Sequence, residues 1–284
     1  MIGGSLDEAH LRGWIGREDH SEHEVGEDFA RRFLATFDDL ETPWTAGTAV
    51  PHLLHFCLPQ AIVATTALDR DGHPERGDFL PPVPLPRRMW AGGEVRLHDD
   101  LRIGERLRRV SRIADVVVKE GRSGTLCFVT VHHALTAGGR QILEDVQFIV
   151  YRDEPGRGAP ASSPAPAPEG TDRRRVDPTT SLLFRYSALM FNAHRIHYDR
   201  DYAVGVEGYP GLVVQGPMMA TLMFRLATEV RGRRPDVFAY RGETPLFDTA
   251  PFFVHARADD SGLELWTASQ GGPVAMRSSA RWTS

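Results

Sequence analysis

Ionisable and amide side chains crowd one short stretch of the chain. Residues 191–203 read FNAHRIHYDRDYA and stand shortly before EGYPGLVVQGP. The side chains of interest in this stretch are Asn192, His194, His197, Asp199 and Tyr202. An imidazole has an ordinary pKa of about 6.5, so a histidine both accepts and returns a proton at neutral pH. The composition of this stretch therefore favours general acid–base chemistry.

Two other interpretations of the same stretch stay open. His194, His197 and Asp199 are possible metal ligands, but the spacing lacks the glutamate base that lies between the histidines of the zinc-protease helix motif. A polar surface turn is the third interpretation, and it needs no chemistry. We favour the acid–base interpretation and expect no metal.

A helix that begins near Gly216 supplies a second functional element. The segment PMMATLMFRLATEV has a proline in its first turn and Gly232 shortly after its end, which is typical of a helix over residues 217–230. The first N–H groups of a helix have no partner within the helix, so they can stabilise a developing oxyanion. Gly216 would also let a carbonyl approach the backbone closely. Together the two elements predict a general base that faces an oxyanion hole.

Other catalytic classes lack their sequence signatures. The chain contains no GxSxG elbow, no GxxxxGK[ST] phosphate loop and no GxGxxG dinucleotide turn. Cys57 and Cys127 each stand in an apolar run with no second thiol nearby, which indicates buried, reduced thiols. Serine or cysteine nucleophiles, kinases, P-loop ATPases and classical dehydrogenases are therefore disfavoured.

Composition excludes several broad classes of protein. The chain has 284 residues, of which 41% are hydrophobic and 25% charged, as in a globular protein with a sizeable core. Its formal net charge of -5 gives no general attraction to nucleic acid. The sequence starts without a signal-peptide pattern and has no apolar run of membrane-spanning length, so we expect a cytoplasmic protein.

A Pro/Ala-rich segment divides the chain into two halves. Residues 154–180 read EPGRGAPASSPAPAPEGTDRRRVDPTT and contain almost no large apolar residue, which predicts an extended linker. The predicted domains are residues 1–153 and 181–284. Each is expected to place helix before antiparallel strands, which suggests an α+β duplication.

The expected elements follow from periodicity and turn residues. In the first half we expect helices over residues 21–37 and 52–68, the second interrupted near Pro59, and then strands over 94–101, 105–121, 125–137 and 140–153. In the second half we expect strands over 236–247, 252–262 and 263–269 after the helix.

The stretch FRYSALMFNAHRIHYDRDYA with the following EGYPGLVVQGP resembles the MaoC-like hydratases and dehydratases of the hotdog fold. The resemblance is to their double-hotdog branch, which contains mesaconyl-C4-CoA (3-methylfumaryl-CoA) hydratase, itaconyl-CoA hydratase and the type 2 3-hydroxyacyl-thioester dehydratases. FLPPVPLPRRMWAGGEVRLHDDLRIGE extends it to most of the chain. It implies an α+β double hotdog, in which an antiparallel sheet wraps a long central helix twice. The first repeat would bind substrate and CoA, and the second would carry the catalytic motif.

The family signature assigns roles to single residues. It reads Asp, any residue, Asn, Pro, an aliphatic residue, His; on this chain Asn192 takes the place of the aspartate and His197 that of the histidine. Because an amide accepts no proton at neutral pH, the resemblance implies that His197 is the sole titrating base and acid. Asn192 would orient the water or the thioester, and the Gly216 N–H would stabilise the enolate oxygen.

Supporting roles follow from position. Asp199 stands two residues beyond His197 and would fix its tautomer if the segment is extended. His194 and Tyr202 complete the loop, and Gln215 stands in the pocket lining where the branch tends to have histidine.

Arginines are expected to hold the anionic parts of a CoA substrate. Arg87 and Arg88 are candidates for the CoA phosphates, and Arg185 for a substrate carboxylate. The further candidates for phosphate contacts are Arg102, Arg106, Arg108, Arg109, Arg112, Arg173, Arg174 and Arg175.

The expected function is reversible hydration of a short branched dicarboxylyl-CoA, such as itaconyl-CoA or mesaconyl-CoA, to citramalyl-CoA. No cofactor is expected, because CoA belongs to the substrate. The alternatives are a 3-hydroxyacyl-thioester dehydratase of fatty-acid synthesis, a thioesterase, and a non-catalytic acyl-CoA-binding module. Exposed sheet edges in hotdog proteins also predict a homo-oligomer.

Overall fold

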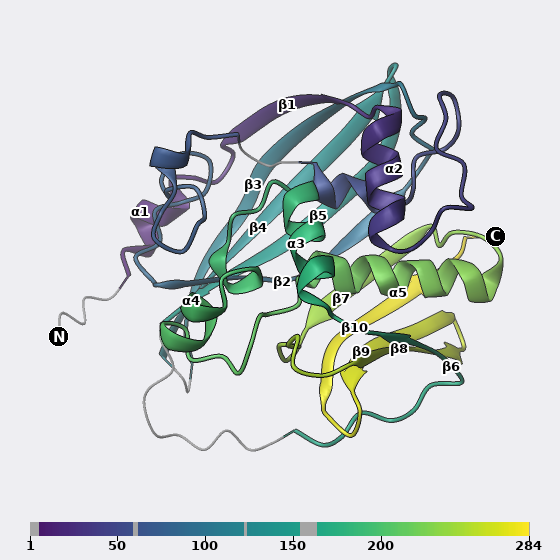
Figure 1. Cartoon of the computed structure of the whole chain (residues 1–284). Helices are drawn as coiled ribbons and strands as arrows, with labels where there is room; N and C mark the ends of the chain where they lie inside the picture. The colour runs from purple at the N-terminus through teal and green to yellow at the C-terminus, as the bar shows by residue number, and fades with distance from the viewer. Residues whose placement is uncertain (1–5, 59–61, 122–123, 154–163, 284) are drawn as a thin grey trace.

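The strands of both halves form one antiparallel sheet. The computed structural model describes residues 6–58, 62–121, 124–153 and 164–283. Ten strands lie in the order β1-β3-β4-β5-β2-β7-β10-β9-β8-β6 (Figure 1). Their bounds are β1 Glu18–Glu24, β2 Arg87–Leu97, β3 Arg106–Gly121, β4 Gly124–Ala137, β5 Arg140–Arg152, β6 Asp172–Val176, β7 Val237–Gly242, β8 Phe252–Asp259, β9 Gly262–Ser269 and β10 Val274–Arg281.

The two halves of the sheet repeat one topology. In each half the first strand, β1 or β6, lies at the outer edge, and the second, β2 or β7, lies at the junction. β2 pairs antiparallel with β7, from Gly92 opposite Arg241 to Arg96 opposite Val237. The remaining three strands of each half form a meander between edge and junction. The predicted α+β duplication is therefore confirmed.

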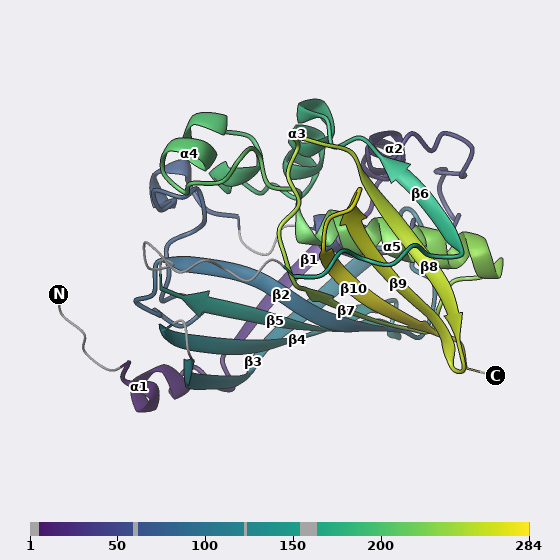
Figure 2. The ribbon, with the colours of Figure 1, turned by 90° about the horizontal axis from the view of Figure 1, so that it is seen from below.

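The principal helices lie on one side of the sheet, and the second half of the sheet curls around α5 (Figure 2). α5 packs on β7, β8, β9 and β10, while α2 packs on α3. The helix bounds are α1 Glu8–Arg12, α2 Glu27–Thr36, α3 Thr180–Leu189, α4 Arg200–Gly205 and α5 Gly216–Arg231, with the 3-10 turns η1 Leu54–Cys57, η2 Thr65–Ala67 and η3 Arg195–His197. The predicted helix over residues 217–230 is confirmed, and Gly232 ends it in the left-handed conformation with a φ of 73°.

Both repeats contribute to one main hydrophobic core. Buried side chains of the first repeat, such as Leu54 and Val95, belong to the same cluster as Met223 and Phe238 of the second. Cys57 and Cys127 are free and fully buried, as expected. No helix in the described ranges is long and apolar enough to cross a membrane.

The first half departs from the expected helices. Residues 18–24 of the sequence form edge strand β1, so the helix predicted over residues 21–37 begins only at Glu27, as α2. The predicted helix over 52–68 is wrong: this segment contains two short 3-10 turns instead. Leu53 has a φ of 60°, which no α-helix allows.

The predicted linker is partly structured. Its first part, residues 154–163, lies outside the described residues, as does Pro59. Its later part contains β6, which pairs with β8 at the sheet edge. The second repeat thus begins before the predicted boundary at residue 181. The composition did not indicate this strand, because Arg173, Arg174 and Arg175 lie on an exposed sheet edge that needs few apolar residues.

Candidate active site

His197 is held as a neutral imidazole with one free nitrogen. Its Nδ1–H donates a hydrogen bond to the Val213 carbonyl, at 2.7 Å, and the Val213 N–H donates to the Ile196 carbonyl. Because a carbonyl only accepts, Nδ1 carries the proton and Nε2 keeps its lone pair. Among the described residues Nε2 has no hydrogen-bond partner. Burial lowers the pKa of His197 to about 4, so the ring is neutral at pH 7 and ready to accept a proton.

Asn192 shapes the loop that carries His194. The Asn192 Oδ1 accepts a hydrogen bond from the backbone N–H of His194, at 3.0 Å. The His194 ring lies edge-on to the His197 ring, with 5.3 Å between the ring centroids. Asn192 therefore helps to place His194 beside His197, and its expected contact with water or thioester stays a prediction.

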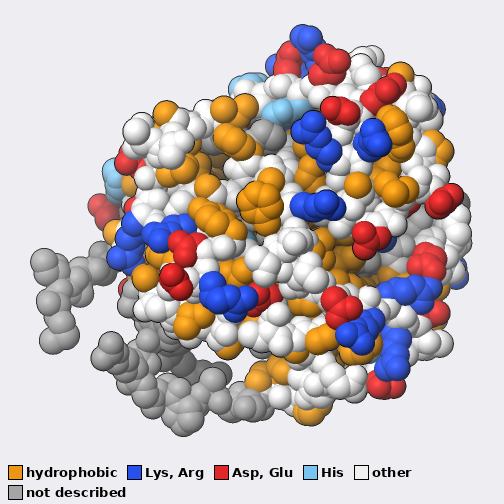
Figure 3. All heavy atoms as spheres, viewed as in Figure 1, with side chains coloured by type: hydrophobic (Ala, Val, Ile, Leu, Met, Phe, Trp, Pro, Cys, Tyr) orange, Lys and Arg blue, Asp and Glu red, His pale blue; other side chains and the backbone are white. Residues whose placement is uncertain are grey.

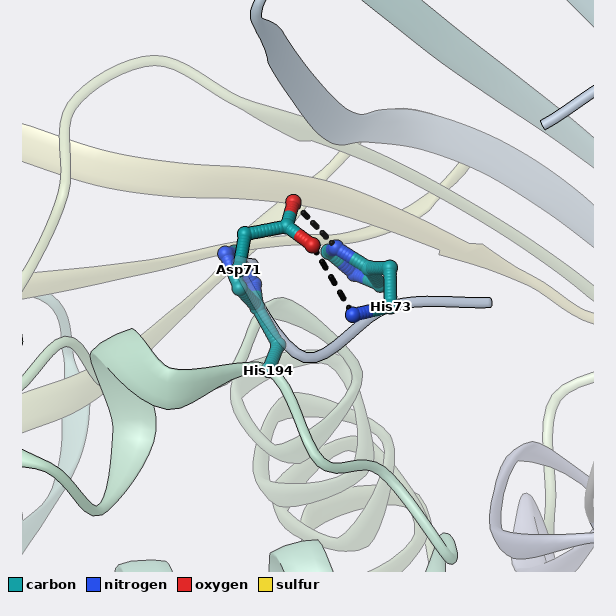
Figure 4. Close-up of side chains that lie close together, drawn as sticks. All are labelled: Asp71, His73 and His194. Carbon is teal, nitrogen blue, oxygen red and sulfur yellow. Dashed lines mark hydrogen bonds and ion pairs between the residues drawn. The ribbon is translucent and has the colours of Figure 1, made fainter. Parts of the chain in front are cut away.

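The first repeat brings a carboxylate and a third imidazole to this loop. Asp71 Oδ2 lies 2.9 Å from His73 Nδ1, and Asp71 Oδ1 accepts the backbone N–H of His73 (Figure 4). The His73 ring packs against His194, with the centroids 4.0 Å apart and the ring planes tilted by 37°. Sequence reasoning missed both residues; the only signal was an aspartate and a histidine two positions apart in the turn RDGHPE.

A glycine allows the turn of the first repeat to meet the loop of the second. Gly72 has a φ of 89°, and a Cβ on it would lie 1.8 Å from the Ala193 carbonyl oxygen. Arg195 adds two hydrogen bonds to this contact. Its backbone N–H donates to the Asp71 carbonyl, and its Nη1 donates to the Arg70 carbonyl. The two repeats are thus joined where their histidines meet.

β2 of the first repeat forms a wall beside the histidines and the start of α5. Arg88 and Trp90 stand two positions apart, so they face the same side of the strand. The positive charge of Arg88 adds to burial in lowering the pKa of His73 to about 4, while Asp71 opposes this effect. The Trp90 ring lies 2.8 Å from where a Cβ on Gly216 would stand. Only glycine therefore fits at the start of α5.

The start of α5 offers a free N–H group, but Gln215 is not a ligand there. Gly216 is the first residue of α5, and its N–H donates no hydrogen bond to any described residue. Gln215 is only 1% exposed and donates to the Leu183 carbonyl and to Ser187 Oγ. Gln215 thus ties α5 to α3 through its amide nitrogen, and its expected place in the pocket lining stays a prediction.

The expected role of Asp199 is wrong. Its Oδ2 pairs with the Arg195 guanidinium at 2.8 Å, and its Oδ1 accepts the Tyr202 N–H as the N-cap of α4. The Val213 carbonyl, not Asp199, fixes the tautomer of His197. Tyr202 donates to Glu207, and burial raises its pKa to about 12, so the phenol stays protonated.

An open cavity of about 480 Å³ lies next to Asp71. It lies between segment 69–87 of the first repeat and residues Tyr202 and Glu207 of the second. The arginines that line it are Arg70, Arg76 and Arg87. Arg87 pairs with Glu207 at 3.3 Å, and Arg76 donates to three backbone carbonyls. Arg70 and Arg76 were missed by sequence reasoning.

The remaining predicted arginines lie in varied surroundings. Arg185 is exposed on α3. Arg109 is buried and donates to the Leu58 carbonyl. Arg106, Arg173, Arg174 and Arg175 form local ion pairs, and Arg102 donates to the Gly47 carbonyl.

Asp71, His73 and His194 also meet the distance condition for a metal site. One ligand atom from each lies within 4.8 Å of the others. Both Asp71 oxygens already accept hydrogen bonds from His73, however, and the charge of Arg88 reaches both histidines. A positive charge there opposes a second cation. We therefore interpret the cluster as a carboxylate–imidazole pair packed against a second imidazole.

The chain is similar to known proteins in both sequence and structure. Residues 50–248 match the family hydroxyacyl-thioester dehydratase type 2. Mesaconyl-C(4)-CoA hydratase of Chloroflexus aurantiacus is 43% identical over 275 residues, which are 95% of this chain and 97% of that protein. Mitochondrial hydroxyacyl-thioester dehydratase type 2 of Schizosaccharomyces pombe is 43% identical over 80 residues, 27% of each chain.

Solved structures agree in fold. A MaoC-like dehydratase from Phytophthora capsici gives a TM-score of 0.71 at 14% identity, covering 98% of both chains. A Mycobacterium tuberculosis protein described as having a double hotdog fold gives 0.58 at 12% identity, covering 94% of this chain and 96% of that one. The expected double hotdog is thereby confirmed.

Proposed function

The chain belongs to the hydroxyacyl-thioester dehydratase type 2 family, and on this premise we propose that it reversibly hydrates a short branched dicarboxylyl-CoA. It is a hydro-lyase, as its family and its relative from Chloroflexus aurantiacus indicate. The proposed substrates are mesaconyl-CoA and itaconyl-CoA, and the proposed product is citramalyl-CoA. The observation that carries the proposal is the neutral His197, whose Nε2 is free and whose Nδ1–H is held by the carbonyl of Val213, three residues before the start of α5.

The proposed chemistry uses the chain's own groups. Nε2 of His197 takes a proton from water as the oxygen attacks the β-carbon of the enoyl thioester. The electron pair of the double bond moves toward the thioester oxygen, which the Gly216 N–H and the positive end of α5 stabilise. Addition of water is neither an oxidation nor a group transfer, so the proposed reaction needs no cofactor.

Arginines near the cluster are the candidates for an anionic acyl-CoA. The cavity beside Asp71 is lined by three arginines, Arg70, Arg76 and Arg87, and by four carboxylates, Asp69, Asp71, Glu75 and Glu207, so a CoA phosphate there would have to bind the arginines in place of their present partners. Arg88 lies close enough to His73 to act on its pKa, and it is therefore a candidate for the free carboxylate of the acyl group. The exposed Arg185 remains the other candidate.

Dehydration of a 3-hydroxyacyl thioester is the second candidate function. The match to the yeast mitochondrial dehydratase supports it, and the same groups would run the reaction in reverse. Trp90 fills the space beside Gly216, however, which favours short acyl groups over long ones. A thioesterase or a non-catalytic binding module has no observation of its own in support.

A substrate panel tests the function. Purified wild-type protein should hydrate mesaconyl-C4-CoA or itaconyl-CoA faster than crotonyl-CoA or a long 2-enoyl-CoA, measured by loss of enoyl absorbance and by product mass. His197→Ala should lower kcat by about 10²–10⁴-fold, the usual range for an acid–base group. Release of free CoA thiol, or binding without turnover, would contradict the assignment. Faster turnover of long 3-hydroxyacyl thioesters would favour the second candidate.

A further inference from the structure

Hydration of an enoyl thioester needs two proton transfers at different atoms. One proton leaves the attacking water, and another arrives at the α-carbon. His197 has one free nitrogen and no carboxylate partner among the described residues, since its Nδ1–H is used by the Val213 carbonyl. The proton for the α-carbon therefore calls for a second acid–base group.

We propose that His73, oriented by Asp71, is the second catalytic imidazole and delivers the proton to the α-carbon. This inference rests on the proposed function. The active site then combines residues of both repeats. The base that activates water lies on the second repeat, and the acid that protonates the α-carbon lies on the first. Asp71 is a positioning residue in this scheme.

The geometry of the turn over residues 69–76 supports the assignment. The Asp71 carboxylate takes both the ring Nδ1–H and the backbone N–H of His73, each at 2.9 Å, which fixes the ring and leaves Nε2 as its exchangeable position. The side chains of Asp71 and His73 are 15% and 20% exposed, so small molecules can reach the pair. His73 is thus the one imidazole of the cluster that has a carboxylate to stabilise its cation.

His194 lies between the two proposed catalytic rings. It packs against His73 at 4.0 Å and lies edge-on to His197 at 5.3 Å between centroids. Burial and the neighbouring histidines lower its pKa far below the ordinary value, so it stays neutral. A neutral imidazole both accepts and donates a proton, so His194 can take part, together with solvent, in returning a proton from His197 to His73.

The proton balance closes over one turnover. Hydration starts with His73 protonated and His197 neutral. His197 Nε2 takes a proton from water, the C–O bond forms at the β-carbon, and the double-bond electrons pass to the thioester oxygen. The enolate then takes the proton from His73 Nε2 to form the α-carbon–hydrogen bond. Transfer of one proton from His197 through His194 or solvent to His73 restores the start.

Binding of an anionic substrate would favour the protonated state of His73. The charged and titratable groups around His73 are Asp71, Arg76, Arg88, His194 and His197. Arg88 and Arg76 oppose protonation of His73, while Asp71 supports it. A substrate carboxylate placed against Arg88 would offset the charge of that arginine, so binding of a dicarboxylyl-CoA would help to protonate His73.

His73→Gln is the direct test, with mesaconyl-C4-CoA as probe, because its double bond is conjugated to the thioester and its hydration protonates the α-carbon. We expect kcat for hydration to fall by about 10²–10³-fold with KM changed by less than about threefold. Because hydration needs His73 protonated, wild-type kcat should fall on the alkaline side of the pKa that His73 has with the dicarboxylyl-CoA bound, and this alkaline limb should vanish in the variant. Exchange of the α-hydrogen of citramalyl-CoA with D2O, followed by mass spectrometry, should be lost as well.

Asp71→Asn keeps the shape of the turn and tests the positioning role. It should lower kcat about tenfold and move the alkaline limb to lower pH, because the imidazolium loses its carboxylate. His98→Gln is the matched control, since His98 is an exposed histidine of the first repeat paired with Glu144. The control should retain wild-type kcat and pH profile.

Three outcomes would overturn the assignment. Wild-type kcat and pH profile in a folded His73→Gln variant would remove His73 from the reaction. Loss of wild-type activity on dialysis against EDTA, restored by a divalent metal, would make the cluster a metal site. Retained α-hydrogen exchange in His73→Gln would give the carbon proton to another group. A wild-type protein that hydrates no enoyl-CoA would instead refute the proposed function.

Discussion

At the residue scale, the group that hydrogen-bonds to His197 decides which substitutions affect catalysis. Sequence spacing suggested that Asp199 fixes the tautomer of His197, but Asp199 is occupied by Arg195 and by the N-cap of α4. The extended conformation that would place both side chains together does not occur, because η3 includes His197. The Val213 carbonyl fixes the tautomer instead. Because every residue has a backbone carbonyl, the sequence could not indicate this contact.

Asp199→Ala should separate these two roles. We expect a lower thermal unfolding midpoint, because α4 loses its N-cap and Arg195 its carboxylate. We expect kcat to stay within about twofold of wild type with an unchanged pH profile, unlike the large loss at an acid–base group. Calorimetry and kinetics from pH 5 to 9 measure both. A shifted pH profile would restore Asp199 as the partner of the imidazole.

The sequence was most informative where residue type alone determines chemistry. His197 and Gly216 were identified from residue type and helix-start signals; the structure confirms the helix start at Gly216 and places the His197 Nδ1–H on the carbonyl of Val213, three residues earlier in the chain. Asp71 and His73 were missed because they stand more than one hundred positions before His194 in a turn with no helical or strand period. Their role depends on a contact between repeats, which no local pattern encodes.

At the element scale, turn 69–76 is positioned by backbone contact with loop 192–199. Gly72 has a left-handed φ and lies against the Ala193 carbonyl, so two separate constraints require glycine. The turn carries Asp71 and His73, and the loop carries His194 and His197. The contact between the turn and the loop therefore depends on Gly72, which has no side chain.

Gly72→Ala should reduce both stability and kcat, because its Cβ adds a clash with the Ala193 carbonyl to the backbone strain. The matched control is Gly104→Ala, whose φ of 93° is similar but whose Cβ would meet nothing within 4 Å. The control should lower the free energy of unfolding by about 1–2 kcal/mol and leave kcat unchanged. Gly72→Ala should also lower kcat by about 10²-fold, since the clash must move the turn by an ångström or more. Equal kcat in both variants would contradict this account.

Strand prediction succeeded and failed for physical reasons that differ between elements. β3, β4 and β5 alternate buried and exposed residues, so their pattern indicated strands correctly. β1 reads EDHSEHE and lies at the sheet edge, where neither face of the strand needs apolar residues. Its acidic residues matched the start of a helix instead, which explains the wrong assignment.

At the scale of the whole molecule, the two repeats share one sheet, one core and one site. The face that carries α3 and α4 shows charged side chains of both signs among exposed hydrophobic ones (Figure 3). Phe184, Phe191 and Val206 are among the exposed apolar residues there. Self-association stays a prediction, and the free edges of the sheet are β1 and β6.

Histidines kept neutral by burial link the stability of this shared structure to pH. Burial lowers the pKa of His52, His73, His133 and His197 to about 4, against 6.5 in the unfolded chain. Between these values the unfolded chain binds more protons than the folded one. Their contribution to stability is therefore fully present above pH 6.5 and is lost as the pH falls toward 4.

Urea denaturation between pH 7.5 and 4.5 measures this effect. We expect the free energy of unfolding to fall with pH, each of these imidazoles contributing at most about 1.4 kcal/mol per pH unit. His52→Asn should reduce the slope by one imidazole, because His52 lies against Phe224 away from the catalytic cluster. A free energy of unfolding that stays constant from pH 7 to pH 5 would show that these rings bind protons as readily in the folded chain as in the unfolded one, and would contradict the lowering of their pKa by burial.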